Sequence, residues 1–184
     1  MNLRSIITIA FVSSIFTVNA QNDHAHSTAK QDTTKKSIPK EEHAQIGEAH
    51  ITILYTAPAV RNRVIWGGLV AYDQVWSTGA HKATSFEINH SFTIGGKKIP
   101  AGKYGIFTIP GKDKWTFILN KNWNQHLADD YETKDDVTRI TITPKILLKN
   151  QERLEYSIKE LSETECVLEI TWEKIKIAVP IKIN

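Results

Sequence analysis

The sequence predicts an all-β protein, an antiparallel β-sandwich with a barrel-like arrangement as the alternative. Three observations support this fold class. Apolar and polar side chains alternate with a period of two from residue 49 onward, as in strands that bury one face. Glycine and proline mark short turns between the alternating segments. No window shows the 3.6-residue apolar period of a helix, so helix is expected only as one or two short turns, near residues 72–76 or 125–131.

The alternating segments follow one another closely along the chain. Ile51, Ile53 and Tyr55 share one face of the first segment, and Thr52 lies on the other face. This pattern predicts half-buried strands, about eight to ten in all, joined mainly as hairpins. The further alternating segments are 84–88, 104–106, 115–119, 140–142, 154–158, 166–172 and 175–183.

Two turns have residues suited to hairpins. Gly95-Gly96 separates residues 92–94 from 97–99, and both glycines can adopt positive φ, so a two-residue hairpin loop is predicted there. Residues 110–113, Pro-Gly-Lys-Asp, connect the segments around Tyr104 and Trp115 in the same manner.

The first residues are typical of a secretory signal peptide. A short basic start is followed by an apolar run over 6–16 and by small residues ending at Ala20, so residues 1–20 are predicted to be removed by cleavage after Ala20. The run is too short to span a bilayer, so no transmembrane segment is expected. The protein is therefore expected to be exported, to the periplasm or outside the cell. It is not expected to be a lipoprotein, because no cysteine lies near the cleavage point.

The remaining chain divides into a linker and one domain. Residues 21–47 are polar, contain His24 and His26, and have almost no large apolar side chain, which predicts a flexible linker. Residues 48–184 are predicted to form the single β-sandwich domain. With 23 basic and 20 acidic residues the chain has no basic excess for nucleic acid, and its single cysteine, Cys166, is expected to be a buried apolar residue.

A side-chain-rich stretch at 55–87 is the first candidate site. Its tryptophans and basic residues could bind a small polar ligand at one end of the sandwich, with a contribution from the 120–131 loop. In the alternative interpretation, Trp66 and Trp76 pack beneath the loop and the charged residues form ion pairs. The ligand-binding candidates are Arg61, Arg63, Trp76, His81, Lys82 and Asn120.

Histidines and acids suggest a second candidate, a divalent metal site. Such a site requires three or four converging ligands, and the sequence alone cannot bring these residues together. A solvated acidic loop is the alternative for residues 129–136, because their spacing differs from that of a calcium-binding loop. The metal-binding candidates are His50, His81, His126, Asp129 and Asp130.

Three function classes remain open. The leading hypothesis is an exported domain that binds a small ligand or a divalent metal ion. The second is a hydrolase-type enzyme with His81 or His126 as general base, although nucleophile-elbow, phosphate-loop and zinc-protease motifs are absent from the sequence. The third is a structural or interaction module of the cell envelope, whose protein partner the sequence does not identify.

Several motifs in order resemble one family over nearly all of the chain after Gly47. They are APAVRNR at 57–63, IWGGLV at 65–70, VWSTGAHKAT at 75–84, AGKYGIFTIPG at 101–111, WTFILNK at 115–121, QHLADDY at 125–131 and WEK at 172–174. With these motifs the chain resembles the exported bacterial family of domains of unknown function numbered twenty-nine eleven. Family members commonly carry Arg, Asn and Glu where this chain has Ser77, His81 and Lys82. The resemblance implies an exported β-rich domain without an assigned activity.

Overall fold

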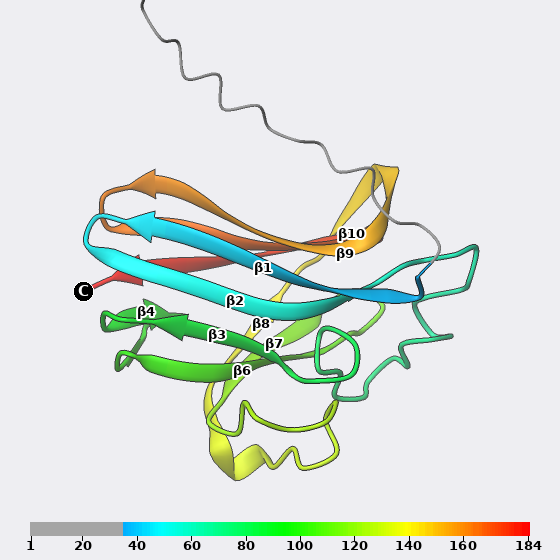
Figure 1. Cartoon of the computed structure of the whole chain (residues 1–184), viewed down its shortest axis with the longest axis horizontal. Coiled ribbons are helices and arrows are strands. Elements are labelled where there is room, and N and C mark those ends of the chain that lie inside the picture. Colours follow the sequence, from blue (N-terminus) through cyan, green and yellow to red (C-terminus); the bar gives the residue numbers. More distant parts are fainter. Residues whose placement is uncertain (1–34) are drawn as a thin grey trace, which may run out of the picture. The chain divides into compact units, whose positions relative to one another are not determined.

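A computed structural model describes residues 35–184, whose strands form two antiparallel sheets packed against each other (Figure 1). The predicted antiparallel β-sandwich is therefore confirmed. The six-stranded sheet has the order β1 (Ser37–Ile46), β2 (Ala49–Pro58), β3 (Thr84–Ile88), β6 (Gly102–Ile109), β7 (Trp115–Asn120) and β8 (Asp136–Ile142). The four-stranded sheet has the order β5 (Lys97–Ile99), β4 (Phe92–Ile94), β10 (Glu165–Ile183) and β9 (Lys145–Ser162).

Strand β1 corrects the predicted domain boundary. It lies inside the 21–47 segment that was expected to be a flexible linker, and it pairs with β2 along its whole length. The sequence does not show the apolar alternation of a strand here, because Lys40 and Glu42 occupy inward-facing positions of β1 together with apolar residues such as Ile38 and Ile46. The cross-strand pairing with β2, more than its own apolar content, orders this segment. The folded domain therefore begins about ten residues earlier than predicted.

The beginning of the chain lies outside the described residues. The predicted signal peptide, residues 1–20, and residues 21–34 of the predicted linker both belong to that part. No helix within residues 35–184 has the length and the apolar composition needed to cross a membrane.

The hairpin turns use glycine where the backbone requires positive φ. Gly95 and Gly96 have φ of 58° and 78° and join β4 to β5 by the predicted two-residue loop. Gly47, with φ of 55°, is the first residue of an equally short loop between β1 and β2. Among residues 35–184 the single helical element is a 3₁₀ turn, Thr133–Asp135, just after the 125–131 segment in which a helical turn was expected.

The long hairpin of β9 and β10 links the two sheets along one side. Ala59, just past the end of β2, forms a backbone bridge with Arg153 of β9. The Glu42 side chain of β1 accepts a hydrogen bond of 3.2 Å from the backbone N–H of Ile158. The carboxylate thus replaces a strand-to-strand hydrogen bond where β1 and β9 approach without pairing. This side of the sandwich is therefore nearly closed, which gives the fold a partial barrel character.

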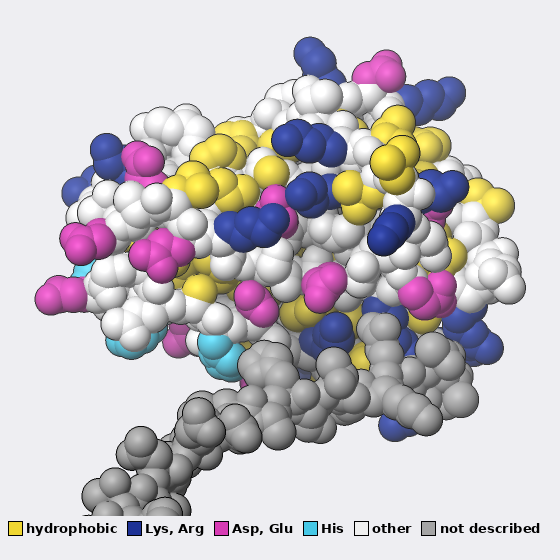
Figure 2. All heavy atoms as spheres, turned by 90° about the horizontal axis from the view of Figure 1, so that it is seen from above, with side chains coloured by type: hydrophobic (Ala, Val, Ile, Leu, Met, Phe, Trp, Pro, Cys, Tyr) yellow, Lys and Arg dark blue, Asp and Glu magenta, His cyan; other side chains and the backbone are white. Residues whose placement is uncertain are grey.

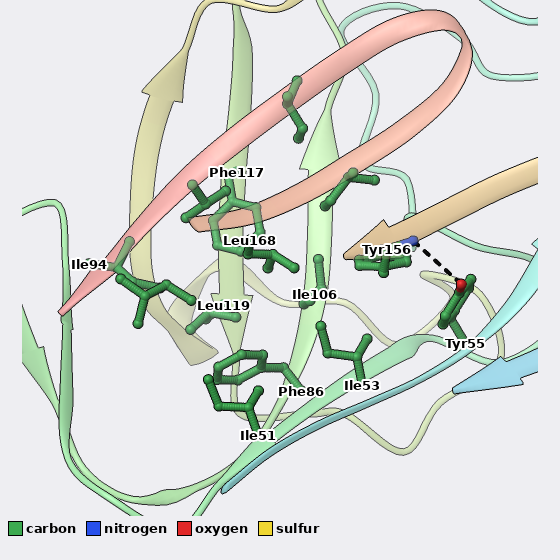
Figure 3. Close-up of a cluster of buried hydrophobic side chains, with 14 of the residues drawn as sticks. Ile51, Ile53, Tyr55, Phe86, Ile94, Ile106, Phe117, Leu119, Tyr156 and Leu168 are labelled. Carbon is green, nitrogen blue, oxygen red and sulfur yellow. Dashed lines mark hydrogen bonds between the residues drawn. The ribbon is translucent and has the colours of Figure 1, made fainter. Parts of the chain in front are cut away.

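The core fills the space between the sheets. Ile53 and Phe86 of the six-stranded sheet and Leu168 of β10 are at most 1% exposed, and Figure 3 shows them in one cluster. In the same view the backbone N–H of Tyr156 donates to the Tyr55 hydroxyl at 3.4 Å. Burial raises the pKa of Tyr55 to about 12, so this hydroxyl stays neutral in the core.

Four tryptophans form a second part of the core. The Trp66 ring centroid lies 4.7 Å from that of Trp115 and 5.7 Å from that of Trp172. Trp76 stacks on Trp172 with centroids 5.6 Å apart, and its indole N–H donates to the Gly79 carbonyl at 3.0 Å. Trp66 and Trp76 therefore pack within the sandwich, as the alternative interpretation of the 55–87 stretch expects.

Candidate functional site

The register of four strands creates a depression on the outer face of the six-stranded sheet. Glu41, Leu54, Ser85 and Gly105 lie in one row across β1, β2, β3 and β6. Their neighbours along each strand, such as Phe86, face the core, so this row faces outward. The side chains of the row are long or bulky at Glu41 and Leu54, small at Ser85 and absent at Gly105. The outer surface is therefore low at Ser85, and at Gly105 it leaves room for another segment of the chain to pack on the sheet.

The loop that follows β7 turns this depression into a groove. Residues 121–132, here called the capping loop, lie over the outer face of the sheet and carry Trp123 and Asn124 at the groove. The groove has a volume of about 600 Å³, within the range of small-molecule sites. It is lined by Pro39, Lys40, Glu41, Leu54, Tyr55, Thr56, Lys82, Ala83, Ser85, Lys103, Trp123 and Asn124.

Asn120 holds the capping loop in place. Its side-chain amide N–H groups donate to the Glu132 carbonyl at 3.0 Å and to the Asp136 carboxylate at 2.8 Å. Its side-chain oxygen accepts from the backbone N–H of Asn122 at 2.8 Å. The Tyr131 hydroxyl donates to the same Asp136 carboxylate, and burial followed by this hydrogen bond raises the pKa of Tyr131 to about 12. Both ends of the loop are thus fastened to β7 and β8.

A small apolar cluster supports the loop from below. Phe107 of β6 and Ile118 of β7 point outward from the sheet and are fully buried, together with Ala83. The Phe107 ring packs on Tyr131 of the capping loop with centroids 5.1 Å apart. Gln125 adds hydrogen bonds to this packing. In one of them its backbone carbonyl accepts from the Ala83 N–H at 3.0 Å. The capping loop is therefore packed against the outer face of the sheet.

Lysines and exposed apolar side chains give the groove its chemistry. The Lys103 ammonium lies 4.4 Å from the centre of the Trp123 ring and 3.2 Å from the Glu87 carboxylate. Lys82 lines the groove without an ion pair among the described residues, and Glu41 stands on the β1 side. Leu54 and Trp123 are 41% and 37% exposed, which is high for large apolar side chains.

The structure brings four of the predicted site residues, His81, Lys82, His126 and Asp129, together at one end of this groove. Lys82 forms a backbone bridge with His126, and the N–H of Leu127 donates to the His81 carbonyl at 2.7 Å. His126 Nδ1 lies 2.8 Å from the Asp129 carboxylate. Backbone hydrogen bonds of the kind found between strands therefore join the segment around residue 81 to the capping loop.

His81 also contacts the start of β1. Its Nε2 atom lies 2.9 Å from the hydroxyl oxygen of Ser37, and its backbone has a positive φ of 65°. A positive φ is uncommon outside glycine and is stabilised here by the surrounding loop contacts. The pair therefore has hydrogen-bonding geometry near the groove, with both residues accessible to solvent.

Of the remaining metal candidates, His50 lies apart, whereas Asp130 follows Asp129 in the capping loop. His50 is at the other end of β2, where its backbone N–H donates to the Asn89 side chain at 2.7 Å. The backbone N–H of Asp130 donates to the Gln125 side chain at 3.1 Å. Within residues 35–184 no group of three or more His, Cys, Asp or Glu side chains is placed to hold a metal ion.

The remaining ligand-binding candidates are engaged in structural contacts. Arg63 donates to the carbonyls of Val60 and Ala59 at 3.1 and 2.5 Å. The backbone N–H of Arg61 donates to the Glu152 carboxylate at 2.9 Å. Trp76 packs in the tryptophan cluster and Asn120 holds the capping loop, as described above. Of the six candidates, Lys82 alone lines the groove, and His81 lies beside it.

Sequence reasoning did not single out most of the groove. Leu54 and Ser85 belonged to predicted strands without a role of their own, and Lys103 and Gly105 were noted only as part of the AGKYGIFTIPG motif. Trp123 lies in the 120–131 loop, which was expected to contribute to the ligand site, but it was not itself a candidate. The available signal was an outward-facing leucine in an otherwise alternating strand, together with a glycine inside the strand of residues 102–109.

The fold and the groove define a class: a two-sheet antiparallel β-protein with a shallow basic and aromatic groove on the outer face of its larger sheet. A family model described as protein of unknown function (DUF2911) matches residues 37–181, so the chain belongs to this family. The match begins at the first residue of β1 and includes every strand in whole or in large part. Searches of curated proteins and of solved structures found no match.

Proposed function

We propose that the protein binds a small ligand that combines an anionic group with an apolar body, and that the groove on the outer face is the binding site. The observation that carries this proposal is the co-location of Lys82, Lys103 and two exposed apolar side chains, Leu54 and Trp123, around one hollow of about 600 Å³. Ligand sites typically combine an apolar lining with a few polar groups that fix orientation.

The charge of the lining favours an anion. Lys82 has no carboxylate partner among the described residues, and Lys103 shares its charge between Glu87 and the Trp123 ring. Glu41 is the acid on the opposite side of the groove. A ligand anion near Lys82 therefore meets a cation that has no competing partner in the described part of the chain.

A binding titration with anilinonaphthalene sulfonate tests the proposal, because this dye joins a sulfonate to aromatic rings. We expect saturable binding with increased dye emission. Charge reversal by Lys82→Glu should weaken the binding by about tenfold or more, since it replaces an attraction by a repulsion. The matched control is Lys98→Glu, an equal charge change in β5 outside the groove, which should leave the affinity unchanged.

A second variant distinguishes dye binding in the groove from nonspecific dye binding elsewhere on the surface. Ser85→Leu adds apolar volume that fills the floor of the groove, and it should remove dye binding while the melting temperature stays near that of the parent. If Ser85→Leu does not fold, Leu54→Asp is used in its place. This substitution removes an exposed apolar side chain of the same row and should also remove dye binding. Equal dye affinity in the parent, Lys82→Glu and the filled variant contradicts the proposal.

The Ser37–His81 pair favours a second candidate, a hydrolase-type activity with Ser37 as nucleophile and His81 as general base. The 2.9 Å distance between the hydroxyl oxygen and Nε2 is the geometry that serine activation requires. A fluorophosphonate probe should then label Ser37, and the label should be lost in Ser37→Ala and in His81→Gln. Absence of labelling in the parent protein rejects this candidate.

Export of the chain forms part of the proposal. Support comes from the sequence of residues 1–20, with its basic start, apolar run and small residues before Gln21. Amino-terminal sequencing of the protein recovered from its native host should begin at Gln21. A chain that retains Met1 and stays inside the cell contradicts export.

A further inference from the structure

One stretch of β9 presents aliphatic side chains to solvent. Ile146 and Leu148 are 82% and 102% exposed, the latter as open as in an extended chain. β9 is the outermost strand of the four-stranded sheet, and its contacts with the 59–60 segment begin only at Glu152. Residues 145–151, here called the free edge, therefore have no strand on their outer side within the described part of the chain.

The free edge is basic as well as apolar. Lys145 and Lys149 flank the aliphatic side chains, and neither has an ion pair among residues 35–184. On the same hairpin, Lys159 and Lys176 are paired with Glu169 at 2.7 and 2.9 Å. The unpaired cations of this hairpin thus include the two that flank its exposed aliphatic residues.

The acid nearest to these lysines along β9 contacts the backbone and forms no ion pair with either of them. The carboxylate of Glu152, the nearest acid along β9, accepts a hydrogen bond from the backbone N–H of Arg61 at 2.9 Å. Figure 2 views the molecule from above Figure 1, from the side where β9 lies, and shows hydrophobic, basic and acidic side chains mixed on this face. The two unpaired lysines and the two exposed aliphatic side chains of the free edge complement a partner that is both anionic and apolar.

We propose that the free edge of β9 docks on an anionic lipid surface, with Ile146 and Leu148 entering the interfacial layer and Lys145 and Lys149 contacting the headgroups. Aliphatic side chains flanked by lysines are the combination that binds at the membrane interface. Neither the groove nor two smaller hollows among the described residues include this stretch, so its form suits a surface better than a small ligand. The inference is independent of the proposed ligand.

A fluorescent label at position 148 tests the docking directly. Cys166 is buried, which raises the pKa of its thiol to about 11, so a thiol-reactive nitrobenzoxadiazole label should attach only to the cysteine introduced by Leu148→Cys in the full chain. Vesicles of phosphatidylcholine with phosphatidylglycerol should then shift the emission to the blue and increase it. The matched control is Leu161→Cys, 65% exposed near the other end of β9, which should show no shift.

Charge-reversal variants test the part played by the lysines. Lys145→Glu with Lys149→Glu should weaken vesicle binding of the labelled chain by at least roughly fivefold per residue, because each basic residue near an anionic surface contributes about 1 kcal/mol. Lys97→Glu with Lys98→Glu is the matched control in β5 and should leave binding near that of the parent.

The label also identifies the outcomes that overturn the inference. No shift at position 148, an equal shift at position 161, or an equal shift with pure phosphatidylcholine vesicles would each reject docking on anionic lipid. A shift with polyglutamate but none with vesicles would also reject it, in favour of an acidic protein partner. Because the label reports the environment of position 148 itself, vesicle binding by another part of the chain does not produce a positive result.

Discussion

Gly105 lies directly beneath Trp123. A Cβ atom at Gly105 would be 3.2 Å from the Trp123 Cα and 2.7 Å from Cε2 of Phe107. The capping loop can therefore approach the sheet this closely only because β6 has no side chain at this position. The missing side chain thus allows Trp123 to lie at the groove.

Replacing Gly105 should disturb the fold and the groove together. Gly105→Ala forces Phe107 and the loop backbone to shift, so we expect the free energy of unfolding to fall by about 1–3 kcal/mol and dye binding to weaken. Urea denaturation measures the first effect and dye titration the second. Ser85→Ala, which removes an atom from the same row, is the control and should change stability by less than about 1 kcal/mol. An unchanged denaturation midpoint for Gly105→Ala would show that the loop approaches less closely.

The hydrogen bonds of Asn120 predict a structural role for this residue. Asn120→Ala removes the bonds to Glu132, Asp136 and Asn122, and we expect unfolding to become easier by about 2–4 kcal/mol in the absence of any ligand. Asn124→Ala, an exposed change in the same loop, should cost little. If Asn120 served ligand binding alone, Asn120→Ala would reduce dye affinity and leave thermal stability unchanged.

The Glu169 carboxylate should make stability depend on pH in the acid range. Burial alone would raise the pKa of Glu169, but the hydrogen bonds from Lys159 and Lys176 outweigh it and hold the pKa below its ordinary value of 4.5. A lowered folded-state pKa stabilises the fold above pH 4.5, and this contribution is lost as the pH falls through the folded-state value.

Glu169→Gln should reveal this contribution. The parent should be more stable than the variant by up to about 1 kcal/mol near neutral pH, and the difference should shrink below pH 4.5. Urea denaturation at several pH values measures the difference. Glu155→Gln, at an exposed position of β9, is the control. A difference that grows toward low pH would have the wrong sign and would contradict the assignment.

The Cys166 thiol should be inert while the protein is folded. Burial, followed by the charge of Glu160, raises its pKa to about 11, and the side chain is 1% exposed. We expect no reaction with a colorimetric disulfide reagent at pH 8 in the native state and one thiol per chain after denaturation. Rapid reaction of the native protein would show that the structure opens readily around the start of β10, where Cys166 lies.

The fold could be predicted because most strands alternate apolar and polar residues, and the core-facing set, such as Ile51 and Ile53, stands out. β1 could not, because its inward positions include Lys40 and Glu42, whose place is set by pairing with β2 and by the contact with β9. The last two predicted strands, 166–172 and 175–183, are one strand, β10. An irregular register near Glu173 shifts the alternation of apolar and polar residues in β10 by one position. In the sequence this shift resembles the gap between two separate strands.

The groove could be predicted only in part. Lys82 and His126 were candidates because of their residue types, and the backbone bridge that joins them was not foreseeable from their separation in sequence. Leu54, Ser85 and Gly105 become neighbours through strand register alone. Register depends on the whole sheet, so residues without a chemical motif can form a site that no local pattern indicates.

The pairing of β4 with the very end of β10 constrains the order in which the chain can fold. Thr93 and Asn184 are hydrogen-bonded although 91 residues separate them, and Ile183 pairs with Phe92. The smaller sheet cannot be completed until the end of β10 has been synthesised, after every strand of the larger sheet. Folding should therefore be slow, in the range of milliseconds to seconds that contacts of long sequence separation impose.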